Sequence, residues 1–212
     1  MHSSLIQQLL HPDLTAVELD HALTMAKEVN IGGLCLPPFW IKKARRDLQE
    51  TDISLIAAIG YPHGYQMTES KIQQIELALH QGSDELMIAV NLSAFKSGMS
   101  WVKIELAKCA HIIHQASRIM TVMLNLDFLD KREIQELVSI CKDAGTDQIN
   151  LMAAHCNPSQ IQEIRQWIPQ SMGTGVSGME MIWEDYQFLL QQGIEQIMGK
   201  NVLRVIQDYR TA

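Results

Sequence analysis

The sequence lacks the features of a membrane-spanning or secreted protein. No stretch of its 212 residues approaches the roughly 18 consecutive apolar residues that suggest a transmembrane helix. The first residues, Met1 to Gln8, carry neither a basic segment nor a long apolar one, so they do not resemble a secretory signal. These absences predict a cytoplasmic protein that does not interact with membranes.

Cysteine and positive charge are also scarce. The four cysteines have irregular spacings and form no C-x-x-C pair, which favours reduced, buried thiols over a disulfide framework: Cys35, Cys109, Cys141 and Cys156. Seventeen Lys and Arg against 24 Asp and Glu give a net charge of −7, which argues against a nucleic-acid partner. The one short basic cluster is expected to be a solvated helix face: Lys42, Lys43, Arg45 and Arg46.

What the sequence does contain is an alternation of short apolar runs with longer segments of helical periodicity. The runs are apolar on both faces, as in parallel strands covered by helices, and they fall near 5–9, 32–36, 53–59, 85–90, 119–124, 148–152, 171–176 and 196–198. Eight such strands, each followed by a helix, predict an α/β fold, a (β/α)8 TIM barrel. A doubly wound open sheet is the competing architecture, but no G-x-G-x-x-G turn is present.

Capping signals mark several of the expected helices. Thr15 with Glu18 and Asp130 with Glu133 have the spacing of a capping box, and Asn157 with Pro158 offers an N-cap and a first-turn proline. A glycine followed two residues later by an acid precedes three of the strands, at 82–84, 145–147 and 193–195, and predicts a left-handed helix end. No low-complexity linker divides the chain, so residues 1–212 are expected to form a single domain.

Short motifs in order along residues 5 to 205 resemble the deoxyribose-phosphate aldolase family. They include Leu9-Leu10-His11-Pro12-Asp13, Leu34-Cys35-Leu36-Pro37-Pro38, Ile59-Gly60-Tyr61-Pro62-His63-Gly64, Asp84-Glu85-Leu86 with Asn91, Gly145-Thr146-Asp147 and Ser177-Gly178. The resemblance implies a barrel lyase that cleaves 2-deoxyribose 5-phosphate to glyceraldehyde 3-phosphate and acetaldehyde. It also implies a lysine Schiff base, a second lysine beside it, a nearby carboxylate, and no metal or cofactor.

The family's reactive groups do not carry over. The position of the Schiff-base lysine falls on Asn150, that of its neighbour on Gly175, and that of the strand-four aspartate on Met87. Of the family's phosphate-binding glycine pair, only Gly178 remains. We therefore expect a pseudoenzyme related to proteins of carbohydrate metabolism, without Schiff-base aldolase activity, that binds a small phosphorylated sugar or a partner protein and has the option of forming a homodimer.

Residues at the carboxyl ends of barrel strands are expected to line the pocket, because that end of the barrel carries the site in this fold. The candidates are Cys35, His63, Asn91, Asn125, Asp127, His155, Ser177, Gly178 and Lys200. Lys200 is the one lysine expected near the pocket, and six methionines are expected to make it apolar: Met87, Met123, Met152, Met172, Met179 and Met198. The alternative hypothesis is a lyase or another enzyme with a site rebuilt around His63, Asp127, His155 and Lys200. His63, Asp127, His155 and Cys156 could together form a zinc set, but they come from three separate strand ends, so no metal site is predicted.

Overall fold

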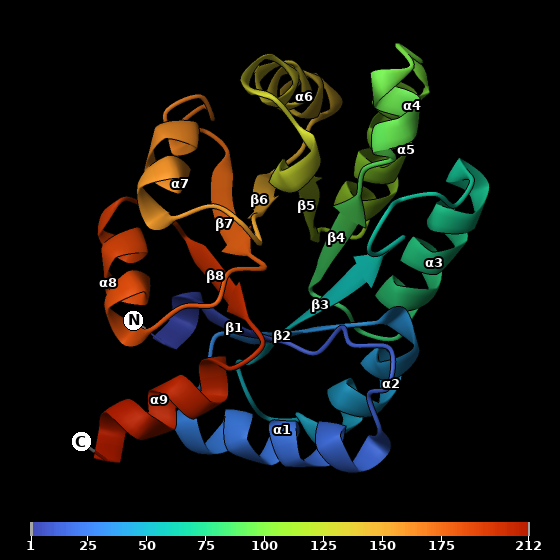
Figure 1. Cartoon of the computed structure of the whole chain (residues 1–212). Helices are drawn as coiled ribbons and strands as arrows, with labels where there is room; N and C mark the ends of the chain where they lie inside the picture. Colours follow the sequence, from blue (N-terminus) through green and yellow to red (C-terminus); the bar gives the residue numbers. More distant parts are fainter. Residues whose placement is uncertain (1, 212) are drawn as a thin grey trace.

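A computed structural model describes residues 2–211, and its centre is a closed barrel of eight parallel strands (Figure 1). The strands pair in chain order, and the last pairs with the first. Their bounds are β1 Leu5–Gln8, β2 Gly33–Leu36, β3 Ser54–Ile59, β4 Glu85–Ala89, β5 Ile119–Asn125, β6 Gln148–Met152, β7 Gly173–Ser177 and β8 Gln196–Gly199. The predicted TIM-barrel class is therefore confirmed.

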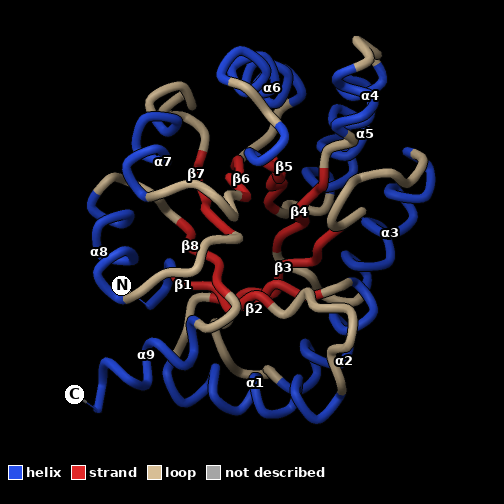
Figure 2. The backbone as a smooth tube through the Cα atoms, in the orientation of Figure 1, coloured by secondary structure: helices blue, strands red, loops and turns tan. Residues whose placement is uncertain are grey.

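Helices surround the ring of strands on the outside (Figure 2). They are α1 Ala16–Val29, α2 Pro38–Asp47, α3 Thr68–His80, α4 Leu92–Lys96, α5 Trp101–Gln115, α6 Lys131–Ala144, α7 Pro158–Arg165, α8 Trp183–Gln191 and α9 Val202–Thr211. Two short 3-10 turns, His2–Ser4 and Leu126–Phe128, complete the elements. None of the helices among the described residues combines the length and apolar character needed to cross a membrane.

Alternate residues of each strand face opposite sides of the barrel wall, and each side has its own core. Outward-facing residues pack under the helices in one large cluster that includes Leu34, Leu55 and Ile88. Inward-facing residues form a second, smaller cluster inside the barrel: Ile6, Cys35, Ile56, Ala58, Met87, Ala89, Met123 and Met198. Fully buried faces on both sides explain why the strands read as continuous apolar runs.

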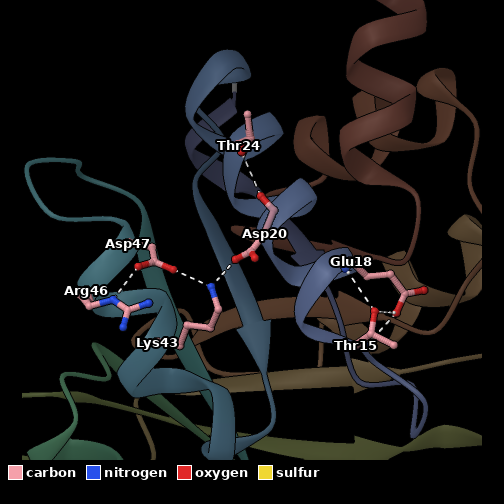
Figure 3. Close-up of polar contacts among 7 residues, drawn as sticks. All are labelled: Thr15, Glu18, Asp20, Thr24, Lys43, Arg46 and Asp47. Carbon is pink, nitrogen blue, oxygen red and sulfur yellow. Dashed lines mark hydrogen bonds and ion pairs between the residues drawn. The ribbon is translucent and has the colours of Figure 1, made fainter.

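The predicted helix caps are present. Thr15 and Glu18 exchange side-chain and backbone hydrogen bonds at the start of α1 (Figure 3), and Asp130 with Glu133 does the same for α6. Asn157 caps α7 ahead of Pro158. The glycines of the three repeated turns all have positive φ, as predicted: Gly82 at 95°, Gly145 at 83° and Gly193 at 78°. One strand differs from its prediction, because β7 begins at Gly173 rather than 171 and Met172 instead closes a turn on Pro169.

The basic cluster on α2 lies among acidic partners. Lys43 pairs with Asp20 of α1 and with Asp47, and Arg46 also binds Asp47 (Figure 3). Arg45 binds Asp84 at the start of β4. The two cations at Asp47, first Arg46 and then Lys43, lower the pKa of that carboxyl to about 2. These contacts tie α2 to its neighbours and offset the positive charge of the helix.

Candidate functional site

The carboxyl ends of the strands open into a row of cavities, which we call the mouth of the barrel. A cavity of about 270 Å³ lies at the ends of β3, β4 and β5 and is named the β3–β5 cavity. A cavity of about 650 Å³ lies at the ends of β7 and β8 and is named the β7–β8 cavity. A third, of about 510 Å³, lies beyond β1, β2 and β3. A space of about 130 Å³ shares Gln8 and Lys200 with the second and Tyr61 with the third.

Methionine and other apolar side chains close the barrel beneath the mouth. Met87, Met123 and Met198 lie within the inner cluster, and Leu10, Tyr61 and Met152 pack against it from above. Burial, and then the nearby Cys35, raises the pKa of the Tyr61 hydroxyl. The predicted methionine lining is thus present in part. Met172 was wrongly expected in the pocket: it lies in the outer core, because β7 starts only after it.

Asn150 and Gly175 lie side by side in the wall of the barrel. They are paired in the register of β6 and β7, and Asn150 is completely buried. The Asn150 carboxamide oxygen accepts a hydrogen bond of 2.6 Å from Ser177, whereas its nitrogen has no partner among the described residues. A Cβ atom at position 175 would lie 3.1 Å from Asn150 Nδ2 and from Gln148 Nε2. The two amide side chains therefore occupy the space that a side chain on residue 175 would enter.

A chain of hydrogen bonds crosses the interior at the other end of the barrel from the mouth. Gln148 donates to Gln196 (2.7 Å), Gln196 donates to Glu85 (2.8 Å), and Thr121 donates to the second oxygen of Glu85 (2.5 Å). Glu85 is 1% exposed, and this burial raises its pKa even though both donors act in the opposite direction. These four residues, which we call the polar chain, link β4, β5, β6 and β8. The resemblance to a known family gave no prediction for them.

Four of the predicted pocket residues are held within the structure by hydrogen bonds or by burial. Asn91 caps α4 by accepting from the Ala94 amide, and Asn125 accepts from the Asp127 amide. Cys35 is fully buried inside the barrel and lines none of the described cavities. Desolvation, and then the negative charge of Glu85, raises the pKa of its thiol. Ser177 is equally buried and donates to Asn150.

The predicted pocket residues that line a cavity are divided between two different cavities of the mouth. His63 and Asn125 line the β3–β5 cavity, whereas Gly178 and Lys200 line the β7–β8 cavity. Asp127 accepts from the backbone amide of His155 at 3.3 Å, and neither residue lines a described cavity. The set His63, Asp127, His155 and Lys200 is therefore not gathered around one cavity.

Sequence reasoning missed several residues that do line the mouth. Lys96 lines the β3–β5 cavity, which corrects the expectation that Lys200 alone would lie near the pocket. Its ammonium binds both oxygens of Glu133, at 2.6 and 2.7 Å. Aromatic residues were also missed: Trp40, Tyr61, Tyr65 and Phe128. Each follows a strand by only a few residues, which is the signal that predicts a mouth position in a barrel.

Charge at the β7–β8 cavity is mixed. Lys200 is the one described cation that lines it, and Glu180 and Asp185 line the same cavity. The Asp185 carboxylate accepts from the Ile182 amide at the start of α8. Among the described residues no group of three or more His, Cys, Asp or Glu side chains is arranged to hold a metal ion.

Known proteins with a similar sequence include deoxyribose-phosphate aldolases. No family model matches the chain. A deoxyribose-phosphate aldolase of Clostridium botulinum (strain Okra / Type B1) is 25% identical over 194 residues, which is 89% of this chain and 91% of that protein. The deoxyribose-phosphate aldolase of Caldanaerobacter subterraneus subsp. tengcongensis is 23% identical over 208 residues, covering 95% and 90% of the two chains.

Solved structures show the same fold. A protein described as an aldolase superposes with a TM-score of 0.90 at 22% identity, covering 99% of this chain and 96% of its own. The deoxyribose phosphate aldolase of Aeropyrum pernix, described as tetrameric, superposes with a TM-score of 0.89 at 20% identity, covering 99% and 91%. Sequence and fold together therefore relate this chain, over most of its length, to the deoxyribose-phosphate aldolase family.

Proposed function

We propose that this aldolase-like barrel does not carry out Schiff-base chemistry and instead binds a small ligand at its mouth. The observation that carries the proposal is the pair formed by Asn150 and Gly175. A Schiff base needs a neutral amine inside the site, and its lysine is activated by burial or by a second cation. On the inner wall of the barrel, β6 has Asn150, whose carboxamide oxygen accepts a hydrogen bond from Ser177, and β7 has Gly175. Neither residue carries an amine that could form a Schiff base.

None of three lysines elsewhere in the described chain has the surroundings of a Schiff-base lysine. Lys71 is the buried lysine of the described chain, but it belongs to α3 and its ammonium donates to Glu105 (2.6 Å) and to the Ala89 carbonyl (3.0 Å). Lys96 is held by Glu133. Lys200 lies in the β7–β8 cavity, where its described charged neighbours are carboxylates rather than a second cation. An amine in such surroundings lacks the groups that make a lysine nucleophilic.

The carboxylate position also differs. Met87 belongs to the inner cluster and is 1% exposed, so this inward-facing position of β4 carries no group that could transfer a proton. Glu85, the nearest acid on this strand, is one inward-facing step further from the mouth and is held by Gln196 and Thr121. Proton transfer requires a group within hydrogen-bonding reach of the substrate, and the methionine layer separates Glu85 from the mouth.

Reductive trapping tests the proposal directly. The purified protein is incubated with acetaldehyde and borohydride, and its mass is measured. We expect no added two-carbon adduct at a specific lysine, and no cleavage of 2-deoxyribose 5-phosphate above background. An adduct that disappears in Lys200→Ala or Lys71→Met would instead show that a relocated lysine carries the chemistry, and the proposal would then be wrong.

A further inference from the structure

We propose that the β3–β5 cavity binds a flat aromatic or heteroaromatic ring. The cavity is formed by three segments that follow neighbouring strands: the loop after β3, helix α4, and the end of β5 with its 3-10 turn. Neither Asn150 nor Gly175 lines this cavity, although Met123, which does, is paired with Asn150 in the register of β5 and β6. The inference therefore goes beyond the proposed loss of Schiff-base chemistry and does not depend on it.

Two exposed aromatic rings, Tyr65 and Phe128, lie at this cavity. Among the aromatic residues whose burial the structure describes, four are markedly exposed: Phe39, Tyr65, Trp101 and Phe128. Tyr65, 67% exposed, and Phe128, 59% exposed, both line the β3–β5 cavity from different loops. Exposed rings that converge on a hollow are typical of ligand recognition.

One wall already contains a stack of rings. The imidazole of His63 lies parallel to the ring of Tyr65, with centroids 5.1 Å apart and an interplanar angle of 24°. Stacked rings offer an incoming ring a flat, polarisable surface, and offset stacking adds to the gain from simple area burial. Met123 contributes from β5, and a thioether makes favourable contacts with ring edges.

The polar groups and the size of the cavity narrow the ligand class. Ser93 and Asn125 offer hydrogen bonds, while the charge of Lys96 is already compensated by Glu133. A ring with one or two polar substituents fits these groups better than a multiply charged phosphate does. At about 270 Å³ the cavity lies just below the roughly 300–1,000 Å³ typical of pockets for larger ligands, so a one- or two-ring compound is the appropriate size.

The test uses the full chain and three probes: indole, benzyl alcohol, and cyclohexylmethanol, which is the saturated counterpart of benzyl alcohol. Binding is followed by the methyl resonance of Met123 in protein labelled with ¹³C-methyl methionine, assigned with the variant Met123→Leu. We expect saturable shifts with indole and benzyl alcohol, and at least tenfold weaker binding of cyclohexylmethanol than of benzyl alcohol.

Substitutions of three exposed aromatic side chains test whether the probes bind in the β3–β5 cavity. Phe128→Ala and Tyr65→Ala should each weaken indole binding by fivefold or more, while Phe39→Ala, at a ring that is 79% exposed and lines no described cavity, should leave it unchanged. All three side chains are exposed, so their removal should leave the thermal unfolding midpoint close to that of the parent. Absence of saturable shifts up to the solubility limit of indole, equal affinity for benzyl alcohol and cyclohexylmethanol, or equal weakening by Phe39→Ala would overturn the proposal. Borohydride trapping reads out a different event, so its result leaves this one unaffected.

Discussion

Glu85 is the residue whose ionisation should be visible in the stability of the protein. Burial raises its pKa in the folded chain above the ordinary value of 4.5. As the pH rises from about 4.5 through the raised pKa, the unfolded chain has already released this proton while the folded chain still holds it. Since stability falls with pH wherever the folded state binds more protons, the contribution of Glu85 is present at low pH and is lost across this window.

Glu85→Gln should remove that pH dependence. A glutamine can keep its oxygen toward Gln196 and place its amide nitrogen near Thr121, whose hydroxyl can accept. We expect the free energy of unfolding of the variant, relative to the parent, to rise between pH 5 and pH 8 in urea titrations. Glu133→Gln is the comparison, because Lys96 lowers the pKa of that exposed carboxyl and its contribution changes only at lower pH. A constant difference between Glu85→Gln and the parent at all pH values would contradict this prediction.

Reinstating the family's groups tests the proposed loss of chemistry residue by residue. Asn150→Lys alone should cleave little 2-deoxyribose 5-phosphate, because the new amine has no cationic neighbour and no carboxylate on β4. Adding Gly175→Lys and Met87→Asp should raise the rate by far more than the separate effects predict, since groups that act as a unit are non-additive. Activity is measured as aldehyde release.

A lysine at position 175 needs space that neighbouring side chains now occupy. A side chain there meets Asn150 and Gln148 at 3.1 Å, so Asn150→Lys and Gln148→Ala should accompany Gly175→Lys to make room. Asn150→Leu serves as the control, because it alters the same wall without adding an amine. Equal rates for the single and combined lysine variants would argue against the proposed division of roles.

At the scale of single elements, the helix-to-strand turns test the role of glycine. Gly145 ends α6 at φ 83°, and a Cβ atom there would have only His114 nearby, at 3.9 Å. Gly145→Ala should therefore lower the free energy of unfolding by about 1 kcal/mol through backbone strain alone, and Gly145→Asn by less. Gly82→Ala should be more harmful, because its Cβ would also lie 2.9 Å from the Arg45 side chain. Chemical denaturation of the three variants measures the order.

Elements with strong local signals are the ones that the sequence predicts well. The capping pairs at Thr15 and Asp130 and the run 148–152 need no knowledge of distant neighbours, because periodicity and capping are local properties. The predicted strand at 171–176 is less accurate at its start, because Met172 is apolar in either a turn or a strand. The start of β7 is set by a turn in which the Met172 amide donates to the Pro169 carbonyl, and the pattern of apolar residues does not predict such a hydrogen bond.

The candidate site is less predictable for a related reason. Asn91 and Asn125 lie at strand ends, where the sequence predicts residues that face a ligand. Their side-chain oxygens accept from backbone amides of the next element, and Asn125 also lines the β3–β5 cavity. The position of a residue after a strand predicts that its side chain lies near the mouth. It does not predict whether that side chain is already hydrogen-bonded to a backbone amide. The polar chain around Glu85 depends on contacts between strands far apart in sequence, and no local pattern indicates them.

At the scale of the whole molecule, Gln7 joins the two ends of the chain. Its side chain, 5% exposed, donates to the Lys200 carbonyl at 2.7 Å and accepts from the Leu203 amide at 3.1 Å. Gln7→Ala leaves both backbone groups without this partner, so we expect a loss of about 2 kcal/mol in the free energy of unfolding. Hydrogen exchange should show faster opening of the first turn of α9 than of β4. Gln66→Ala, at an exposed mouth residue, should leave both measurements unchanged.

Closure of the barrel by β1 and β8 has a consequence for synthesis of the protein. Strand β1 has one neighbour available early, β2, but its other edge pairs only with residues 197–199. A ribosome must therefore synthesise residues 197–199 before the sheet is complete, and until then the nascent chain presents open strand edges that can pair with other chains. Slow elongation between β7 and β8 would prolong that exposed period, so the yield of native protein should depend on codon usage in this stretch and on chaperones that shield the growing sheet.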